Sequence, residues 1–383
     1  MKKLKGMSIA LLLGVPVWAA GQQAAAPGGA DTAPQQGEVQ QAPGQQTPGG
    51  AHRAVAEPPM TGMSGAGRDG IQLNVVVTDK SGTPVAGLNQ QEFTVLDNGQ
   101  PRPILSFHAY TGAVHADGPP VETIILFDRL NMDVEHAGQA RVAIDQYLRG
   151  NGGHLAGPTS VFLFTEDGLQ GETSTTDGNA LAAKVDQIAA RNRSIPQTAG
   201  EWGEQERFNL SLKALGVLIE NEGKQPGRKL LIWVGPGSPL LYGEDITIMP
   251  KELQRDFMTI VNISKLLRED QITMYSVSIG QPDLHNNLYT DYVKGVKEPK
   301  DALPSYLNTK VFAVQSGGLV LGPDNDMARQ IGICQRDASA YYTITFAPPR
   351  ADKRDEYHQI EVDTDKPFLK ARTTTGYYDE PQR

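Results

Sequence analysis

The sequence is poor in three features, and each shortage excludes a class of protein. Cys334 is the single cysteine among 383 residues, which excludes an intrachain disulfide framework and a metal site built from several thiolates. No apolar run reaches the roughly 20 residues that a membrane-spanning helix needs. Basic residues are also in deficit, because 35 Lys and Arg face 44 Asp and Glu, for a formal net charge of −9. Nucleic-acid binders depend on cationic contacts with phosphate, so this class is not expected.

The first 19 residues predict a secretory signal peptide. Lys2, Lys3 and Lys5 form a positively charged region, residues 7–17 are a short apolar stretch, and the small-residue site ending at Ala19 suits cleavage. The stretch is too short to span a bilayer, so we expect no integral membrane span after cleavage. Loss of the three lysines lowers the formal net charge from −9 to −12. We therefore expect an acidic, exported protein that is periplasmic or secreted.

Residues 20–69 predict a disordered linker. Of the 49 residues from 21 to 69, 34 are Gly, Pro, Gln or Ala, and none is Leu, Ile or aromatic. Such a segment cannot bury enough apolar surface to offset the entropy lost on ordering. A proline-rich recognition sequence would need a regular PxxP repeat, which this segment lacks. The folded part of the chain is therefore expected to begin at about residue 70.

Residues 70–118 predict antiparallel strands. Apolar and polar side chains alternate over residues 71–78, and a later strand covers 104–110. Between them, an apolar segment at 93–96 leads to Asn98-Gly99, which is typical of a two-residue hairpin turn because both positions need positive φ. This block is too small to close a core by itself.

Residues 119–338 predict an α/β domain. Near-continuous apolar runs are typical of strands buried on both faces of a parallel sheet, and they lie at 121–128, 160–164, 229–235 and 272–280. Helical periodicity marks the segments between them, at 134–148, 210–219 and 257–267. Strands that alternate with helices predict right-handed crossovers and a doubly wound, Rossmann-like sheet.

Residues 339–383 return to a strand pattern, with strands predicted at 341–348, 358–364 and 368–378. Three strands before the α/β domain and three after it would each leave an apolar sheet face exposed. A single β-sandwich made from both sets buries the two faces against each other. The sequence therefore predicts an α/β domain inserted between two halves of a β-sandwich.

An ordered series of five segments resembles a known family. The segments are ETIILFD with a helix directly after it, GRKLLIWVGPG, VQSGGLVL, and the closing pair YYTITFAP and GYY. Together they are similar to the von Willebrand factor A (VWA) related domain proteins of acidobacteria, over nearly all of residues 70–378. The resemblance implies a VWA-type sheet that binds ligands above the carboxyl ends of its strands, often through a metal ion.

The loop after the first of these strands departs from the metal-binding pattern of the family, Asp-x-Ser-x-Ser, whose oxygens ligate Mg²⁺ or Mn²⁺. Leu130 and Met132 stand at the two serine positions, so the metal-ion-dependent adhesion site is degenerate. Asp128, Asn131 and Asp133 could form a rearranged, weak site for Mg²⁺, Mn²⁺ or Ca²⁺. Alternatively, Asp128 accepts backbone amides of its loop and Asp133 caps the next helix. The second interpretation is favoured because few ligands can be identified, and no other cofactor is expected.

Other catalytic motifs are missing from the sequence. No histidine pair forms HExxH, and no Walker A or Gly-x-Gly-x-x-Gly loop follows a strand. Ser238 does not lie in a Gly-x-Ser-x-Gly esterase loop, and Pro239 after it has no N–H for an oxyanion hole. Asp324 and Asp326 lack the remainder of a calcium loop, and one of them is expected to cap a helix on which Cys334 is buried.

The loops after the strands are the expected interaction surface. Thr165 and Glu166 follow the second strand, and Ser238 and Tyr242 lie in the loop after the third. Ligands of open α/β sheets bind over such ends, where the strand order reverses; the apolar side chains of the third loop could instead fold back on the domain. We expect a non-enzymatic protein that binds a protein or cell-envelope ligand. The alternative is a metal-assisted hydrolase centred on Asp128, and the oligomeric state is left open.

Overall fold

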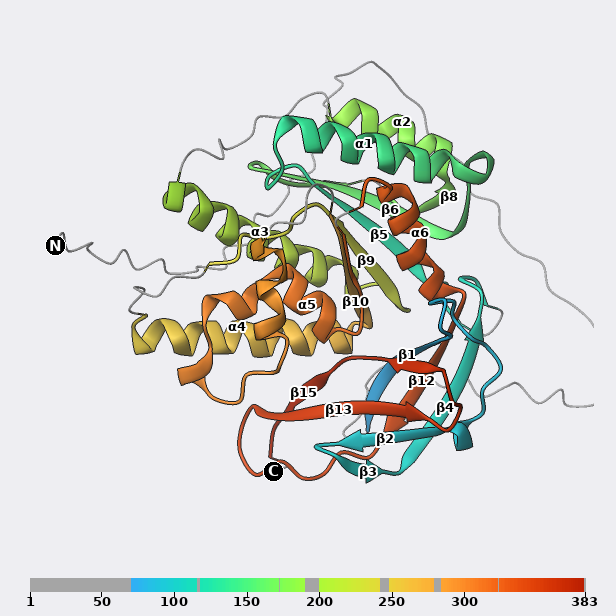
Figure 1. Ribbon diagram of the computed structural model, residues 1–383, viewed down its shortest axis with the longest axis vertical. Coiled ribbons are helices and arrows are strands. Elements are labelled where there is room, and N and C mark those ends of the chain that lie inside the picture. The colour runs from blue at the N-terminus through green and yellow to red at the C-terminus, as the bar shows by residue number, and fades with distance from the viewer. Residues whose placement is uncertain are drawn as a thin grey trace, which may run out of the picture. The chain divides into compact units, whose positions relative to one another are not determined.

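The computed structural model describes residues 70–115, 118–171, 173–189, 200–241, 248–278, 284–322 and 324–381 (Figure 1). The predicted signal peptide (1–19) and linker (20–69) lie outside these residues. The described chain is a mixed α/β protein with one sheet of mainly parallel strands and two antiparallel sheets. None of its described helices combines the length and apolar character that a bilayer span requires.

The largest sheet is built around β5. Its strands are β5 (Glu122–Asp128), β6 (His154–Thr165), β7 (Gly168–Gly171), β8 (Thr175–Asp177), β9 (Lys229–Val234), β10 (Ile272–Val277) and β11 (Val320–Leu321). They lie in the order β11-β10-β9-β5-β6-β7, and β8 also pairs with β6. Strands β5, β6, β9, β10 and β11 are parallel, whereas β7 and β8 run antiparallel to β6. The chain adds β6 on one side of β5 and β9 on the other, so the strand order reverses between β5 and β9.

Helices cover both faces of this sheet. They are α1 (Val134–Arg149), α2 (Gly178–Ala189), α3 (Gly200–Glu222), α4 (Pro250–Glu269), α5 (Thr309–Gln315) and α6 (Met327–Gln335). Successive side chains of a strand point to opposite faces. Ile125 and Phe127 therefore belong to the cluster with α1, α2 and α6, whereas Ile124 and Leu126 belong to the cluster with α3, α4 and α5. Figure 1 shows α1 and α6 on one side of these strands and α4 and α5 on the other.

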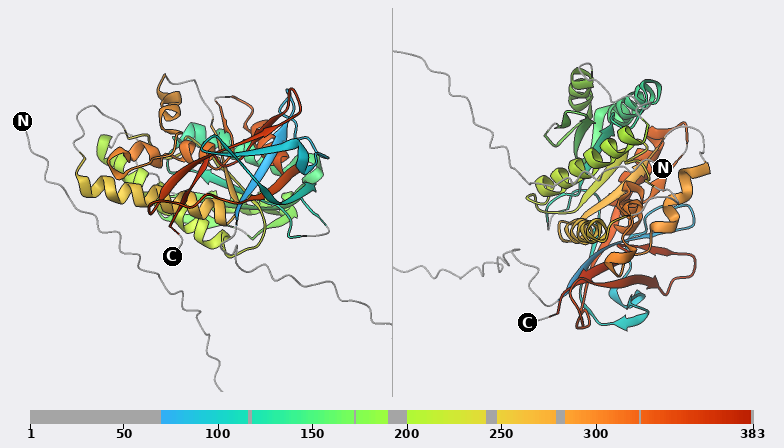
Figure 2. Two further views of the ribbon diagram at one scale, coloured as in Figure 1. Left: turned by 90° about the horizontal axis from the view of Figure 1, so that it is seen from below. Right: turned by 90° about the vertical axis from the view of Figure 1, so that its left-hand side faces the viewer.

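The antiparallel sheets combine strands from both ends of the described chain. Their strands are β1 (Ile71–Thr78), β2 (Phe93–Asp97), β3 (Gln100–Arg102), β4 (Ile104–Thr111), β12 (Ala340–Phe346), β13 (Glu356–Thr364), β14 (Lys370–Arg372) and β15 (Gly376–Asp379). One sheet has the order β14-β1-β12-β4 and the other β15-β13-β2-β3. Figure 2 shows these blue and red strands side by side. Leu73, Phe93, Tyr342 and Ile360 belong to one apolar cluster, so both ends of the chain build the same core.

Several local predictions are confirmed. Asn98 and Gly99, with φ of 49° and 75°, form the turn between β2 and β3. Asp133 is the N-cap of α1 and Asp326 is the N-cap of α6, each through a side-chain oxygen that accepts a backbone N–H of the first turn. Cys334 on α6 is buried. Short polar signals at the ends of elements were thus sufficient to locate the turn and the two helix caps.

The last predicted strand, residues 368–378, is divided into β14 and β15, which belong to different antiparallel sheets. Between them, the Thr373 hydroxyl donates to the backbone oxygen of Asn74 at 2.8 Å. The Thr374 hydroxyl donates to the backbone oxygen of Gln315 at 2.9 Å. The prediction of one continuous strand was wrong because these long-range bonds, which the local pattern does not encode, turn the chain from one sheet to the other.

A buried ionic network joins the α/β part to the antiparallel sheets. The Asp337 carboxylate accepts from the Tyr275 hydroxyl at 2.6 Å and from Arg372 Nη2 at 2.7 Å. Arg228 Nη1 donates to the Asp337 backbone oxygen at 2.8 Å, and its guanidinium lies over the Tyr341 ring. Tyr275 lies in β10 and Arg372 lies in β14. The carboxylate of Asp337 therefore contacts residues of both parts. Removing one member of the Asp337–Arg372 pair would leave a buried charge uncompensated.

Candidate functional site

Asp128 ends β5 where the strand order reverses, and its side chain is fully buried. One carboxylate oxygen, Oδ2, accepts from Trp233 Nε1 at 2.8 Å and from Asn131 Nδ2 at 2.9 Å. The other, Oδ1, accepts from the Asn131 backbone N–H at 3.0 Å and from Asn131 Nδ2 at 3.1 Å. Both oxygens are therefore already engaged by N–H donors of the protein.

Burial raises the pKa of Asp128 to about 6, because the charged carboxylate is removed from water. The hydrogen bonds from Trp233 and Asn131 act in the opposite direction, since they stabilise the charged form. The carboxyl group consequently titrates at about pH 6. A change of pH around this value therefore changes the charge that is buried at the end of β5.

Two residues at the end of the neighbouring strand, β9, lie next to Asp128. Trp233 lies in β9, and its ring meets the Phe164 ring edge-on at a centroid distance of 5.9 Å. Gly235 follows β9 with φ of 145°, and a Cβ built on it would lie 2.8 Å from the Asp128 Cβ. A side chain at this position would therefore collide with Asp128 and would also be strained. Glycine permits the close approach of β5 and β9 at their carboxyl ends.

Asn131 connects the loop after β5 to α3. Its Nδ2 lies 3.1 Å from the Ser211 hydroxyl oxygen, and that hydroxyl donates to the Arg207 backbone oxygen at 2.7 Å. Leu130 and Met132 are buried and belong to the apolar clusters on opposite faces of the sheet. The two positions that carry serine in the metal-binding pattern thus anchor this loop by packing.

Asp133, the third candidate metal ligand, has a different environment. Its Oδ1 accepts from the His136 backbone N–H at 2.8 Å, and this bond lowers the pKa of Asp133. Its side chain is also 45% exposed, so it faces solvent at the start of α1. Asp128 and Asn131 are thus brought together, whereas Asp133 is engaged as a helix cap.

These residues do not fit a divalent cation. Mg²⁺ and Ca²⁺ bind six or more oxygen ligands, and the protein usually supplies several of them. Both oxygens of Asp128 face nitrogen donors, and Asp133 caps a helix. Within the described ranges, no group of three His, Cys, Asp or Glu residues could share a metal ion.

The predicted surface residues are mostly buried. Thr165 is 1% exposed and Ser238 is 3% exposed. Ser238 is held to the start of α5, since its Oγ accepts from the Thr309 backbone N–H at 3.2 Å. Glu166 is partly exposed, and Tyr242 lies outside the described residues. Thr165 and Ser238 are therefore closed to solvent, and Glu166 is the one of the described three that reaches it.

Exposed apolar side chains lie at the starts of three helices. Val134 begins α1, Trp202 lies in the first turn of α3, and Met249 is the N-cap of α4, and they are 79%, 72% and 61% exposed. Helix α1 follows β5, whereas α3 and α4 lead into β9 and β10. All three helices therefore begin at the edge formed by the carboxyl ends of the parallel strands, hereafter the carboxyl edge. Figure 1 shows α3 and α4 beginning on the same side of the molecule.

Sequence reasoning did not single out Trp233 or Ser211. Trp233 carried a usable signal, because a buried tryptophan usually finds an acceptor for its N–H. Asp128 ends the strand that pairs with β9, so it was an available acceptor. Ser211 carried no such signal, since a single serine on the inner face of a long helix does not indicate a distant partner.

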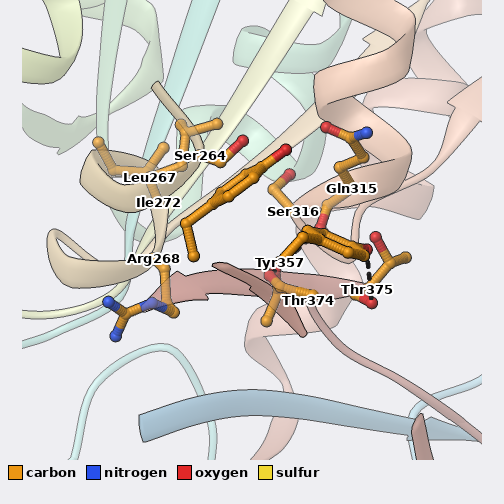
Figure 3. Close-up of a pocket in the computed structure, with 11 residues that line it drawn as sticks. Ser264, Leu267, Arg268, Ile272, Gln315, Ser316, Tyr357, Thr374 and Thr375 are labelled. Carbon is orange, nitrogen blue, oxygen red and sulfur yellow. Dashed lines mark hydrogen bonds between the residues drawn. The ribbon is translucent and has the colours of Figure 1, made fainter. Parts of the chain in front are cut away.

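A small cavity lies where α4 and α5 meet β13 and β15 (Figure 3). Its polar lining includes Ser264, Gln315, Ser316 and Thr375, and the Tyr357 hydroxyl donates to the Thr375 backbone oxygen at 3.2 Å. The cavity has a volume of about 30 Å³. This is enough for one or two water molecules and too little for an organic ligand.

No protein-family model and no curated protein matches this chain. Among solved structures, it is similar to the human COPII-coat protein Sec24c, with a TM-score of 0.34 and 8% identity over 72% of this chain and 46% of Sec24c. It is also similar to the pilus adhesin SpaC from Lactobacillus rhamnosus GG, with a TM-score of 0.37 and 8% identity over 79% of this chain and 49% of SpaC. The chain spans about half the length of both proteins, and TM-scores this low do not define a shared fold.

Proposed function

We propose that this chain is an exported VWA-type binding protein, without enzymatic activity, that holds a protein or cell-envelope ligand at the carboxyl edge. Export, the VWA-type sheet and the β-sandwich are inferred from the sequence. The strand order β11-β10-β9-β5-β6-β7 supports the choice of edge. Ligands of open α/β sheets bind outside the carboxyl ends of the strands where this order reverses.

The environment of Asp128 is the observation that carries the proposal. A metal-assisted hydrolase centred on this residue would need its oxygens to ligate a cation or to accept a proton from water. The side chain is fully buried, and its oxygens accept from Trp233 and Asn131. This arrangement supports a structural role for Asp128, in which the carboxylate fixes the loop that a ligand would contact.

Calorimetric titration of the full chain with Mg²⁺, Mn²⁺ and Ca²⁺ tests the absence of a metal role. We expect no binding heat and no change in melting temperature, because the ligand set around Asp128 is too small. An Asp128→Ala variant is the control. A metal-induced rise in melting temperature that disappears in this variant would contradict the proposal and favour the hydrolase.

The exposed apolar residues at the carboxyl edge indicate where the ligand would bind. Val134, Trp202 and Met249 place apolar surface on the part of the sheet where a ligand is expected. Interfaces are enriched in tryptophan and methionine, which supply large contact areas. The proposal therefore predicts that a partner contacts the starts of α1 and α3.

Site-specific photocrosslinking in the native cell envelope tests this location. A crosslinking amino acid replaces Val134 or Trp202, and Lys224 is the matched control. Lys224 has a side chain that is 64% exposed and lies just after α3, at the opposite edge of the sheet. We expect a discrete adduct from positions 134 and 202 and none from 224. The same adduct from all three positions, or none from the first two, would overturn the proposed function.

A further inference from the structure

An aromatic ring and a carboxylate lie side by side on the exposed surface of α3. Trp202 is 72% exposed, and Glu206 is exposed as well. Residues four apart share one face of a helix, so the indole ring and the carboxylate are neighbours. Gly203 and Arg207, which are buried, form the inner face of the same turns. Most of the Trp202 ring is therefore open to a partner, with a negative charge beside it.

This pair lies beyond the loop that follows β5. Ser211 of α3 meets that loop, since its Oγ lies 3.1 Å from the Nδ2 of Asn131. Trp202 precedes Ser211 by nine residues, which is about 13 Å along a helix that rises 1.5 Å per residue. The helix begins at Gly200, at the carboxyl edge. Its first turns therefore extend past the loop, where a ligand of the carboxyl edge is expected.

The surroundings of the pair are acidic. At the starts of α1, α3 and α4 and in the turn between β6 and β7, the described acidic residues that reach solvent are, besides Glu206, Asp133, Glu135, Glu166, Asp167, Glu204 and Glu252. The lysines and arginines of these segments are Arg129, Lys251 and Arg255, together with Arg207 in the interior. Arg255 is already paired with the buried Asp256 at 3.3 Å. A surface with this excess of negative charge attracts a cationic partner.

The position of Glu206 in the helix separates it from an ordinary capping residue. Acidic side chains are common in the first turn of a helix, because they compensate the partial positive charge of its amino end. Glu204 lies close enough to that end to act in this way. Glu206 is the seventh residue of α3, and the effect fades within the first turn. Its charge is therefore available to a ligand.

We propose that Trp202 and Glu206 bind an arginine or lysine side chain in a basic segment of a partner protein. A cation over the face of an aromatic ring is attracted by the ring quadrupole, and tryptophan gives the strongest interaction of this kind. The Glu206 carboxylate supplies the counter-charge next to the ring. Val134, which is 79% exposed at the same edge, suits an apolar residue of the same segment. The inference rests on the proposed function, since it names the chemistry of the partner.

Calorimetric titration of the full chain with the peptide acetyl-RLRLR-amide tests the site, with acetyl-QLQLQ-amide and acetyl-ELELE-amide as parallel probes at constant ionic strength. We expect only the arginine peptide to bind, and its affinity to fall as salt is added. Trp202→Leu keeps an apolar side chain but removes the ring, and Glu206→Gln removes the charge. Each substitution is expected to weaken the binding of the arginine peptide by about 2- to 10-fold.

Val217→Ala and Glu220→Gln are the matched controls, because they change an exposed apolar residue and an exposed carboxylate near the other end of α3. Val217 is 41% exposed, and the side chain of Glu220 is 74% exposed. Neither substitution should change the affinity. Equal binding of the three peptides, unchanged affinity in Trp202→Leu or Glu206→Gln, or an equal loss in the controls overturns the inference.

Photocrosslinking from position 134 separates this inference from the proposed function. A partner that is captured with the same yield in Glu206→Gln and Trp202→Leu leaves the proposed function intact and removes the cation site. Selective binding of the arginine peptide without any crosslinked partner does the reverse, since it supports the cation site and overturns the proposed function.

Discussion

The raised pKa of Asp128 links the stability of the fold to pH, and the Asp128→Asn variant tests this link. The carboxyl titrates at about 6 in the folded protein, against an ordinary value of 3.8. The folded state therefore binds the proton more tightly than the unfolded chain, and protonation stabilises the fold. This stabilisation is fully present below the unfolded value and is lost as the pH rises through the folded value.

The magnitude follows from the difference between the two pKa values. A shift of roughly two units corresponds to about 3 kcal/mol. Asparagine cannot ionise, but it keeps the size of Asp128 and one oxygen that can accept from Trp233. Its amide N–H groups face the donors of Asn131, and this loss does not depend on pH. Most of this change lies between about pH 4 and about pH 7, where the wild-type free energy of unfolding should fall by about 2 kcal/mol relative to that of the variant.

Urea unfolding of the full chain and of the variant, followed by far-ultraviolet circular dichroism over this pH range, measures the difference. Burial also raises the pKa of Glu222, Asp256 and Asp270. Their contributions are common to both proteins and cancel in the comparison. Two parallel curves of stability against pH would refute the reasoning, because they would show that Asp128 has the same proton affinity in the folded and unfolded states.

Three further substitutions test the packing around the site and the junction. Gly235→Ala is expected to cost more than about 1 kcal/mol in thermal unfolding, because its Cβ would meet the side chain of Asp128 at a φ that suits glycine. Gly216→Ala on α3 has open space and should instead stabilise the protein by about 0.5–1 kcal/mol; equal effects would contradict the steric explanation. Asp337→Asn leaves Arg372 without its counter-charge and should cost about 3–5 kcal/mol in urea unfolding, so a loss below about 1 kcal/mol would show that the network is not essential. Asp133→Ala removes the N-cap of α1 and should lower the free energy of unfolding by about 1 kcal/mol, with no change in the response to Mg²⁺. A metal response that depends on Asp133 would restore it as a ligand.

The strands and helices were largely predictable because their signals are local. The apolar run that ends at Asp128 forms β5, and the alternation over residues 71–78 forms β1. The division of 368–378 into β14 and β15 was not predictable, since Thr373 and Thr374 bond to parts of the chain that are distant in sequence. Hydrophobic periodicity reports which face of an element is buried, but it does not report which sheet the element joins.

The candidate site was predictable in part. The sequence placed Asp128 and Asn131 in one loop, and the capping role of Asp133 followed from its position before a helix. Two contacts of the site could not be predicted from the sequence. Trp233 donates to Asp128 across 105 positions of the sequence, and Ser211 meets Asn131 across 80. Such contacts depend on the order of the strands and on which helix covers which face.

The sequence by itself determined the type of most elements, the shortage of basic residues and the lack of serine oxygens in the loop after Asp128. These properties depend on residue identity and on spacing within a few positions. The tertiary structure decided what each polar group meets. It gave Asp128 an indole N–H, and it buried Thr165 and Ser238. The physical reason is that desolvation and hydrogen bonding depend on all neighbours in space, and those neighbours come from strands and helices far apart in the chain.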